Sequence, residues 1–275
     1  MDKQRYIEYA KRELIVENLE TIYECEERAV YVATTLKYGD IIMKMNDDVY
    51  ELMMEYTALK DMSGNNCAKV YNCIGGEMIL EERIIPGNEL RKVVDTDTRL
   101  SYFVETFNCI HKIPMNAKMY DTYLDWLSRA YEFCIGANVK PELTEKMHVA
   151  KAIGEELFEK YPERVLLHGD LHHDNMLLNK EGKYSIIDPK GVIGPEVFDI
   201  PRFVLNELDE DVNIKGKEHI SYVISELSKR LSYDITDIKK LFFMETILSN
   251  AWCVEDGEEV DEEAIGIAAE ILREV

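Results

Sequence analysis

The pattern of hydrophobic and polar positions changes along the chain from short strand-like runs to long helical periods. Before Pro86 the expected strands share β-branched and aromatic residues bounded by turn signals. They cover residues 29–35, 41–45, 69–74 and 77–85. One helix is expected among them, over residues 50–61, because its apolar side chains recur every three to four positions. The first part of the chain therefore predicts a small β-rich unit with a single helix.

Beyond Gly87 the apolar residues fall mainly at the spacing of amphipathic helices. The expected helices cover residues 99–111, 120–134, 144–161, 198–208, 218–231, 237–254 and 262–275. Two short apolar runs typical of strands lie among them, at residues 165–167 and 185–187, on either side of a polar loop and of residues 176–178. We therefore expect an α+β protein with a small β-rich N-lobe over residues 1–86 and a larger, mainly helical C-lobe over residues 87–275. A cleft between two such lobes is a natural ligand site.

The charge balance is strongly acidic, with 32 lysine and arginine residues against 54 aspartate and glutamate residues and a net charge of −22. A surface of this sign repels phosphate backbones and anionic lipids, so nucleic-acid and membrane partners are disfavoured. It attracts cations, which favours Mg²⁺ and positively charged small molecules as ligands.

The expected location of the protein is the cytoplasm. Residues 1–14 are charged and lack the apolar core of a signal peptide, and no segment approaches the roughly 20 apolar residues that cross a bilayer. The six cysteines are scattered and form no C-x-x-C pair. This distribution favours reduced thiols over a disulfide framework.

The strongest chemical signal is the polar segment 168–175, HGDLHHDN, with Asp188 following thirteen residues after its end. Phosphoryl transfer needs a carboxylate beside the attacking hydroxyl and oxygen ligands for Mg²⁺. Asp170 and Asn175 have the spacing of the H-x-D-x-x-x-x-N catalytic loop of kinases, in which the aspartate is the base and the asparagine binds Mg²⁺. Asp188 then supplies a second metal ligand, because Mg²⁺ prefers hard oxygen donors. A turn and a capping aspartate would explain each residue alone but not their joint spacing.

The loop histidines allow a different chemistry. His168, His172 and His173, together with Asp174, carry the ligand types of a zinc site. Their spacing is not that of a helical metal pair and no cysteine is close, so a metallohydrolase is the weaker hypothesis. We expect His168 to hold the loop and His172 to lie near the substrate.

The segments 166–178 (LLHGDLHHDNMLL) and 186–208 (IIDPKGVIGPEVFDIPRFVLNEL) resemble the aminoglycoside phosphotransferase family of the kinase-like superfamily. The streptomycin and hydroxyurea resistance kinases are the most similar branch. Weaker similarities at 79–87, 109–111 and 250–257 extend the resemblance from Lys44 to the C-terminus. The resemblance implies a protein-kinase-like two-lobed fold. It also implies Mg²⁺-dependent transfer of the γ-phosphate of ATP or GTP to a hydroxyl of a small molecule.

The resemblance also implies the nucleotide contacts. Kinases hold the phosphates with a lysine on a central strand that pairs with a helix glutamate, and Lys44 lies in an expected strand. Glu55 and Glu51, one helical turn apart, are the candidate partners, and Glu55 is favoured by the alanine-containing turn that follows it. Adenine is expected at backbone groups of the hinge, near Glu82 and Ile84.

The acceptor side is less specific in the sequence. The turn at residues 25–28 lacks the glycine-rich loop of protein kinases, which favours a small molecule over a protein as the acceptor. Trp252 would pack on a sugar ring or anchor the core, and Asp199 is expected to form an ion pair with Arg202. Carboxylates that would bind a cationic acceptor, or face solvent, are Glu207, residues 209–211, Glu255 and Asp256.

These observations favour an O-phosphotransferase that acts on a small, cationic, hydroxylated molecule such as a streptomycin-type aminoglycoside. In this hypothesis Asp170 is the catalytic base, Asn175 and Asp188 bind Mg²⁺, and Lys44 binds the phosphates. The alternatives are a kinase of a metabolite such as choline, homoserine or methylthioribose, and a catalytically silent nucleotide-binding protein.

Overall fold

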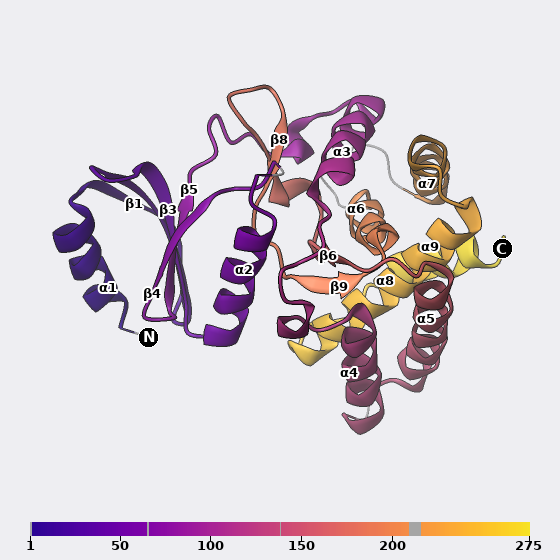
Figure 1. The fold of residues 1–275 in the computed structure, drawn as a ribbon. Coiled ribbons are helices and arrows are strands. Elements are labelled where there is room, and N and C mark those ends of the chain that lie inside the picture. Colours follow the sequence, from indigo (N-terminus) through magenta and orange to yellow (C-terminus); the bar gives the residue numbers. More distant parts are fainter. Residues whose placement is uncertain (1, 65, 138, 209–215) are drawn as a thin grey trace.

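The N-terminal part of the protein is a five-stranded antiparallel sheet flanked by helices (Figure 1). The computed structural model describes residues 2–64, 66–137, 139–208 and 216–275. The sheet order is β1-β2-β3-β5-β4, with β1 at Val16–Glu24, β2 at Arg28–Thr35, β3 at Gly39–Asn46, β4 at Val70–Ile74 and β5 at Met78–Glu82. All neighbouring strands are antiparallel, and the four strands predicted from the residue pattern are all present.

The two faces of this sheet have different partners. Ile41, Met43 and Met45 of β3 are buried in a cluster on one face. Lys44 lies between them in the sequence and so points to the opposite face, because successive side chains alternate along a strand. The helix α2 (Val49–Asp61) lies on that side, between the sheet and the rest of the molecule (Figure 1). Strand alternation thus places the Lys44 ammonium at the boundary between the lobes.

Two N-terminal elements, α1 (Lys3–Tyr9) and η1 (Ala10–Leu14), were not predicted from the sequence. Tyr6, Ala10 and Leu14 recur every four residues and are buried against the sheet. A helical segment this short is marginal by itself, so it depends on the apolar face of the sheet for its stability.

The C-lobe is mainly helical, and the chain enters it through residues 83–89, where the peptide bond between Ile85 and Pro86 is cis. Its helices are α3 (Thr96–Ile110), α4 (Tyr123–Gly136), α5 (Pro141–Lys160), α6 (Ile200–Asn206), α7 (Lys217–Leu231), α8 (Ile235–Glu255) and α9 (Glu262–Leu272). Several helices are capped at their N-terminus by a side chain that accepts a hydrogen bond from a backbone N–H of the first turn. The capping residues are Asp48, Asp95, Thr122, Asp234 and Asp261. The helix expected over 198–208 is shorter than predicted, because η5 (Glu196–Asp199) forms a 3-10 turn before it.

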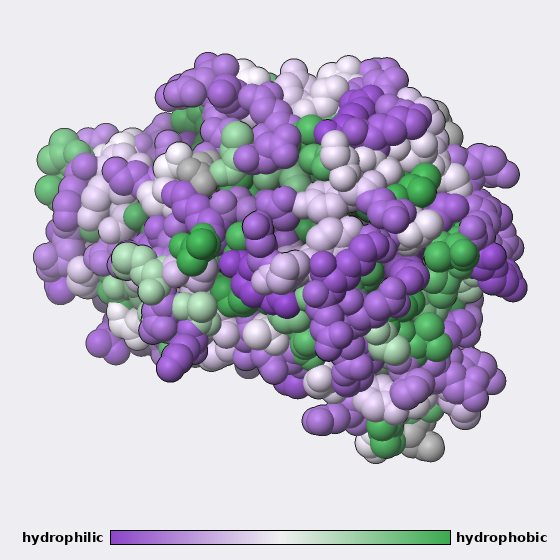
Figure 2. Space-filling view, turned by 45° about the vertical axis from the view of Figure 1, so that its right-hand side comes forward, coloured by the Kyte–Doolittle hydropathy of each residue, from purple (hydrophilic) through white to green (hydrophobic). Residues whose placement is uncertain are grey.

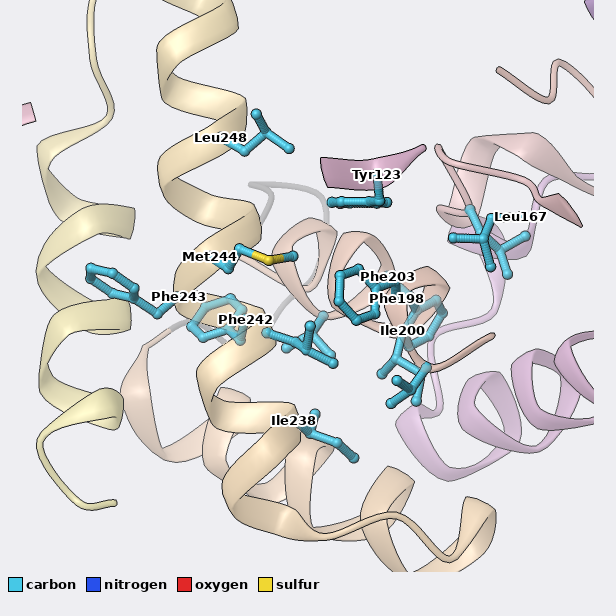
Figure 3. Close-up of a cluster of buried hydrophobic side chains, with 14 of the residues drawn as sticks. Tyr123, Leu167, Phe198, Ile200, Phe203, Ile238, Phe242, Phe243, Met244 and Leu248 are labelled. Carbon is cyan, nitrogen blue, oxygen red and sulfur yellow. The ribbon is translucent and has the colours of Figure 1, made fainter. Parts of the chain in front are cut away.

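The core of the C-lobe is built around α8. Phe242 and Met244 of α8 lie beside Phe198 and Phe203 of the η5–α6 segment (Figure 3). All four side chains are almost completely buried, and burying a side chain of this size contributes about 1.5–3 kcal/mol. This packing fixes α6 against α8.

Two short antiparallel pairs carry the polar loop of the sequence motif. β6 (Val165–Leu167) pairs with β9 (Val192–Gly194), and β7 (Met176–Leu178) pairs with β8 (Tyr184–Ile186). β9 was not predicted, because its two apolar residues, Val192 and Ile193, stand between glycines that indicate a loop. The pairs bring the two ends of the motif together, and the Lys190 N–H donates to the carbonyl of His168 at 2.8 Å.

The surface is dominated by hydrophilic side chains, with hydrophobic ones in small scattered groups on the face that Figure 2 shows. None of the helices in the described parts of the chain is both long and apolar enough to span a bilayer.

Candidate active site

A buried carboxylate anchors the loop between β6 and β7. Asp199 Oδ2 accepts from the His168 N–H at 2.8 Å, and Asp199 Oδ1 accepts from the Gly169 N–H at 2.8 Å. His111 Nε2 lies 2.9 Å from the same Oδ2 atom. The start of the loop is thus held by two charge-assisted hydrogen bonds, which are stronger than neutral ones.

The predicted ion pair between Asp199 and Arg202 is wrong. The oxygens of Asp199 are taken by the loop N–H groups, and its side chain is almost fully buried. Arg202 instead lies 2.6 Å from Glu245 and 3.4 Å from Asp170. A separation of one helical turn would permit this ion pair, but Asp199 and Arg202 each bind other partners that are distant in the sequence.

Two of the three loop histidines are structural. His168 Nε2 lies 2.9 Å from the carbonyl oxygen of Ile187, and His173 Nε2 lies 2.8 Å from Glu207 Oε1. Both rings are fully buried, and burial lowers the pKa of each. The prediction that His168 holds the loop therefore agrees with its contacts.

His172 is partly exposed and lies between two carboxylates. Its Nε2 is 3.7 Å from Asp170 Oδ2, and its Nδ1 is 3.6 Å from Asp174 Oδ2. Asp174 is held in turn by Arg91, whose Nε and Nη2 donate to its two oxygens at 2.6 and 2.8 Å. Among the described residues, no three or more His, Cys, Asp or Glu side chains are grouped to hold a metal ion, so the geometry gives the zinc hypothesis no support.

The structure contradicts the hypothesis that Glu207 binds the substrate. Its side chain has no exposed surface and accepts hydrogen bonds from Arg99 Nε at 2.8 Å, His173 Nε2 at 2.8 Å and His219 Nε2 at 2.7 Å. Burial alone would raise the pKa of Glu207, but these hydrogen bonds outweigh it and hold the pKa well below its usual range. The carboxylate joins three helices and the catalytic loop. Residues 209–211 of the same acidic run lie outside the described residues.

Asp170, the expected base, has polar groups beside both of its oxygens. Arg202 Nε lies 3.4 Å from Oδ1, and Asn175 Nδ2 lies 3.4 Å from Oδ2. Burial would raise the pKa of Asp170, but the neighbouring His172 ring and the charge of Arg202 outweigh it and lower the pKa well below its usual range. The carboxylate is therefore ionised at neutral pH and can accept a hydrogen bond from an acceptor hydroxyl.

Asn175 and Asp188 form a donor set that fits Mg²⁺. Asn175 Nδ2 donates to the backbone carbonyl of Asp170 at 2.9 Å, so the amide oxygen is left to face a cation. Asp188 adopts a left-handed backbone conformation with φ 59°, which is costly for a residue with a side chain and is typical of functional positions. One amide oxygen and one carboxylate, completed by phosphate oxygens and water, match the way Mg²⁺ binds in kinases.

Two lysines neutralise Asp188. Lys44 Nζ donates to its Oδ1 at 3.0 Å, and Lys190 Nζ lies 3.5 Å from its Oδ2. Burial opposes ionisation, but the two ammonium groups outweigh it and lower the pKa of Asp188 to about 2. Asp188 is therefore anionic at any physiological pH.

Lys44 pairs with Glu55 rather than with Glu51. Its ammonium donates to Glu55 Oε1 and lies 4.0 Å from Glu81 Oε1. Burial opposes the charge of Lys44, but the three surrounding carboxylates raise its pKa well above the usual value. Glu51, one turn earlier, contacts Lys190 at 3.3 Å instead. The favoured partner of the sequence analysis is thus the one that the structure brings to Lys44.

The expected adenine site lies where β5 ends. The N–H of Glu82 is used within the sheet, where it donates to the Lys69 carbonyl at 2.7 Å. Ile84, two residues later, is beyond the paired part of β5 and packs with Leu177 and Ile187. These three side chains form an apolar surface beside the end of β5. The sequence analysis did not predict a place for Leu177 and Ile187 beside the expected adenine site. Leu177 lies two residues after Asn175, and Ile187 directly precedes Asp188.

A cavity of about 560 Å³ opens between α2 and the C-lobe. Trp252 and Asp256 line it, as expected of substrate-binding residues, and Trp126 packs edge-to-face on Trp252 with ring centroids 5.5 Å apart. The cavity adjoins the catalytic loop, because a Cβ on Gly169 would lie 2.8 Å from the Trp126 ring. Glu255 is exposed and does not line this cavity.

Several residues of this cavity were not predicted. Asp121, Trp126 and Lys190 line it, and they come from the loop before α4, from α4 and from the loop after Asp188. Only Lys190 carried a local signal, since it lies two residues after Asp188 in the motif. The others reach the site through the folding of distant segments.

The fold and the site define a small-molecule kinase of the protein-kinase-like class. Residues 35–257 match the family model of aminoglycoside/hydroxyurea antibiotic resistance kinases, and the chain belongs to that family. The expected family, enzyme class and two-lobed kinase-like fold are thereby confirmed. No curated protein sequence is similar enough to count as a match.

Solved structures share the fold at low sequence identity. A thermostable mutant of aminoglycoside phosphotransferase APH(4)-Ia, in ternary complex with AMP-PNP and hygromycin B, is 13% identical with a TM-score of 0.71, over 99% of this chain and 98% of that chain. Choline kinase LicA from Streptococcus pneumoniae is 14% identical with a TM-score of 0.67, over 99% of both chains. Plasmodium vivax ethanolamine kinase is 15% identical with a TM-score of 0.68, over 100% of this chain and 88% of that chain.

Proposed function

We propose that the protein transfers the γ-phosphate of ATP, in the presence of Mg²⁺, to a hydroxyl of a small cationic molecule such as a streptomycin-type aminoglycoside. The observation that carries the proposal is the convergence of an ionised Asp170 with Asn175, Asp188 and Lys44. The similar APH(4)-Ia structure with AMP-PNP and hygromycin B supports a nucleotide and a small acceptor as the substrates.

In the proposed reaction Asp170 orients the acceptor hydroxyl and receives its proton. The acceptor oxygen forms a bond to the γ-phosphorus, the bond from that phosphorus to the β–γ bridging oxygen breaks, and ADP leaves with the electron pair. Lys44, held by Glu55, binds the nucleotide phosphates. Mg²⁺ at Asn175 and Asp188 would neutralise the charge on the phosphates. The hinge at Glu82 to Ile84 would receive adenine.

The acceptor cavity suits a positively charged molecule. Trp126 and Trp252 offer aromatic surfaces, and Asp121 and Asp256 offer carboxylates to guanidinium or ammonium groups. His172, beside Asp170, is the loop side chain placed to contact the acceptor near its reacting hydroxyl. These positions support a cationic, hydroxylated acceptor.

A metabolite kinase is the second candidate. The similar structures include choline and ethanolamine kinases. The pair of tryptophans in this chain also offers ring faces to a small ammonium group. A small amino alcohol and an aminoglycoside differ in how much of the cavity they fill, so a substrate panel separates them.

We infer that the reaction takes place in the cytoplasm and that residues 1–86 and 87–275 act as the two lobes around the nucleotide. The six cysteines, all within the described residues, are unpaired, in keeping with a reducing compartment. The strand pairing of β5 ends at Glu82, just before the change of lobe.

The experiment is an ADP-release assay with streptomycin, hygromycin B, choline and ethanolamine as acceptors, with the phosphorylated product identified by mass spectrometry. We expect Mg²⁺-dependent turnover of at least one cationic acceptor. We also expect Asp170→Asn to lose about 10³-fold or more in kcat while ATP still binds. Normal turnover by Asp170→Asn would refute the assigned role, and absence of any acceptor-dependent ADP release would favour the silent nucleotide-binding protein.

A further inference from the structure

Arg202 connects the expected base with the wall of the acceptor cavity. Its Nε lies 3.4 Å from Asp170 Oδ1, and its guanidinium carbon lies 5.6 Å from the ring centroid of Trp252. The side chain is only 14% exposed. A single buried cation is thus shared between the catalytic loop and the cavity.

The far end of the same guanidinium is held by α8. Its Nη2 lies 2.6 Å from Glu245, and its Nη1 donates to Ser249 Oγ at 3.3 Å. Glu245 is 1% exposed and also accepts from the hydroxyl of Tyr123. Since α8 is the centre of the C-lobe core, these contacts fix the direction of the Arg202 side chain.

A purely structural role would make Arg202 the counterion of Glu245. That role uses the Nη groups and leaves the third donor of the guanidinium without a function. Nε is buried and makes no hydrogen bond of normal geometry, and it faces Asp170. Its distance of 3.4 Å exceeds the roughly 2.7–2.9 Å of a charge-assisted hydrogen bond, so a small movement of the carboxylate completes the bond.

We propose that Arg202 is a positioning residue for phosphoryl transfer, whose Nε–H orients the Asp170 carboxylate while its contact with Trp252 sets the distance from that carboxylate to the acceptor cavity. This inference rests on the proposed function. Arg202 acts through Asp170 and does not touch the nucleotide-binding residues, so its loss lowers kcat and leaves the KM for ATP unchanged.

The test uses a background in which Glu245 no longer needs a cation. Glu245→Gln keeps the shape of the buried side chain, and Arg202→Met is added to it, so that no buried carboxylate is left unpaired. In the ADP-release assay, with the best acceptor of the panel above, we expect the double variant to lose about 100-fold in kcat relative to Glu245→Gln alone. The KM for ATP should stay within about twofold. Arg230→Met, which removes a surface arginine paired with Asp97, is the control and should leave both constants unchanged.

The same pair of changes is then introduced into Asp170→Asn. Because Arg202 is proposed to act through Asp170, we expect no further loss of the residual activity. A wild-type kcat in the double variant, an increase in the KM for ATP that matches the loss of kcat, or an equal loss on the Asp170→Asn background would each overturn the inference.

If thermal unfolding shows that the double variant does not fold, Arg202→Lys replaces it. This variant keeps the cation for Glu245 but lacks the Nε–H, and we expect a loss of about tenfold in kcat. An unchanged kcat in that variant would overturn the inference. A wild-type enzyme with no acceptor-dependent turnover would instead remove the proposed function on which the inference rests, so the two failures are distinguishable.

Discussion

Lys44 Nζ lies 3.0 Å from Asp188 Oδ1, and this contact joins β3 of the N-lobe to the segment after β8 in the C-lobe. The same ammonium is bonded to Glu55 of α2. In the proposed function, the phosphates and Mg²⁺ of a bound nucleotide would lie between Lys44 and Asp188. Lys44 would then exchange one anion for another while Glu55 continues to hold it. The ion pair therefore marks where the phosphates are expected to bind.

Glu55→Gln should weaken ATP binding more than Glu51→Gln does. Glu55 is the residue that holds Lys44, whereas Glu51 contacts Asn46 at 2.9 Å and Lys190 at 3.3 Å. A hydrogen bond to a charged group contributes about 1.5–3 kcal/mol, so we expect the KM for ATP to rise about tenfold in Glu55→Gln. Steady-state kinetics with varied ATP measures this. A larger effect of Glu51→Gln than of Glu55→Gln would contradict the pairing.

Trp252→Ala and Asp256→Asn should raise the KM for a cationic acceptor and leave the KM for ATP unchanged. Both residues line the cavity of about 560 Å³, whereas Lys44, the expected phosphate-binding residue, is not among the residues that line it. Loss of an aromatic wall for a cation costs about 0.5–2 kcal/mol, which predicts an increase of roughly three- to thirtyfold. Glu255→Gln is the matched control, since this neighbour is exposed and lies outside the cavity lining. An equal effect of all three changes would argue against the cavity as the acceptor site.

Glu207→Gln should destabilise the fold by about 3 kcal/mol, because it leaves the buried Arg99 without its carboxylate. The contribution of Glu207 to the free energy of unfolding should depend on pH in one direction. The pKa of Glu207 is lowered on folding, so its stabilisation is present above the usual value of 4.5 and is lost as the pH falls toward the lower, folded value. Urea unfolding from about pH 7 to about pH 3 should therefore show a shallower decline in the variant than in the wild type. Glu218→Gln, an exposed glutamate of α7, is the control and should change little. Parallel pH profiles would show that Glu207 is not the carboxylate responsible.

Gly169→Ala should lower kcat strongly and change the free energy of unfolding comparatively little. Gly169 has φ 78°, and a Cβ there would lie 2.8 Å from Trp126 and 3.1 Å from Val192. The side chain would push the loop, and with it Asp170, away from the cavity wall. We expect a loss of about 100-fold in kcat, as for other misplacements of a reacting group by about 1 Å.

Gly182→Ala is the matched control for this prediction. Gly182 has a similar φ of 77°, but nothing lies within 4 Å of the position of its Cβ. We expect this variant to lose about 1–2 kcal/mol of stability from the left-handed conformation while its kcat stays normal. A similar loss of kcat in both variants would assign the effect to backbone strain rather than to the contact with Trp126.

Much of the local structure followed from residue patterns. The spacing of Asp170 and Asn175 is contained in one loop, and short apolar runs on either side are enough to place that loop between strands. Lys44 was found because it lies in an expected strand at about the position that the resemblance implies for the kinase lysine. Glu55 was favoured over Glu51 because of the alanine-containing turn that follows it. In each case the relevant neighbours are close in the sequence.

The errors and omissions arose where the neighbours are distant in the sequence. Glu207 was taken for a solvated or substrate-binding acid, but Arg99 lies 108 positions away from it in the chain and buries it. Asp199 was paired with its helical neighbour, although its partners are N–H groups 30 and 31 positions away. Trp126 carried no local signal of a role in the acceptor cavity.

The sequence by itself pointed to the proposed chemistry, because Asp170, Asn175 and Asp188 lie close together in one stretch of the chain and have the spacing of a kinase loop. Hydrophobic periodicity also predicted most of the strands and helices around them. Only the tertiary structure decided which carboxylates are buried partners of ion pairs and hydrogen bonds and which line the cavity beside α2. The physical reason is that burial and pairing set the charge and position of a carboxylate, and both depend on residues that folding brings together from distant parts of the chain.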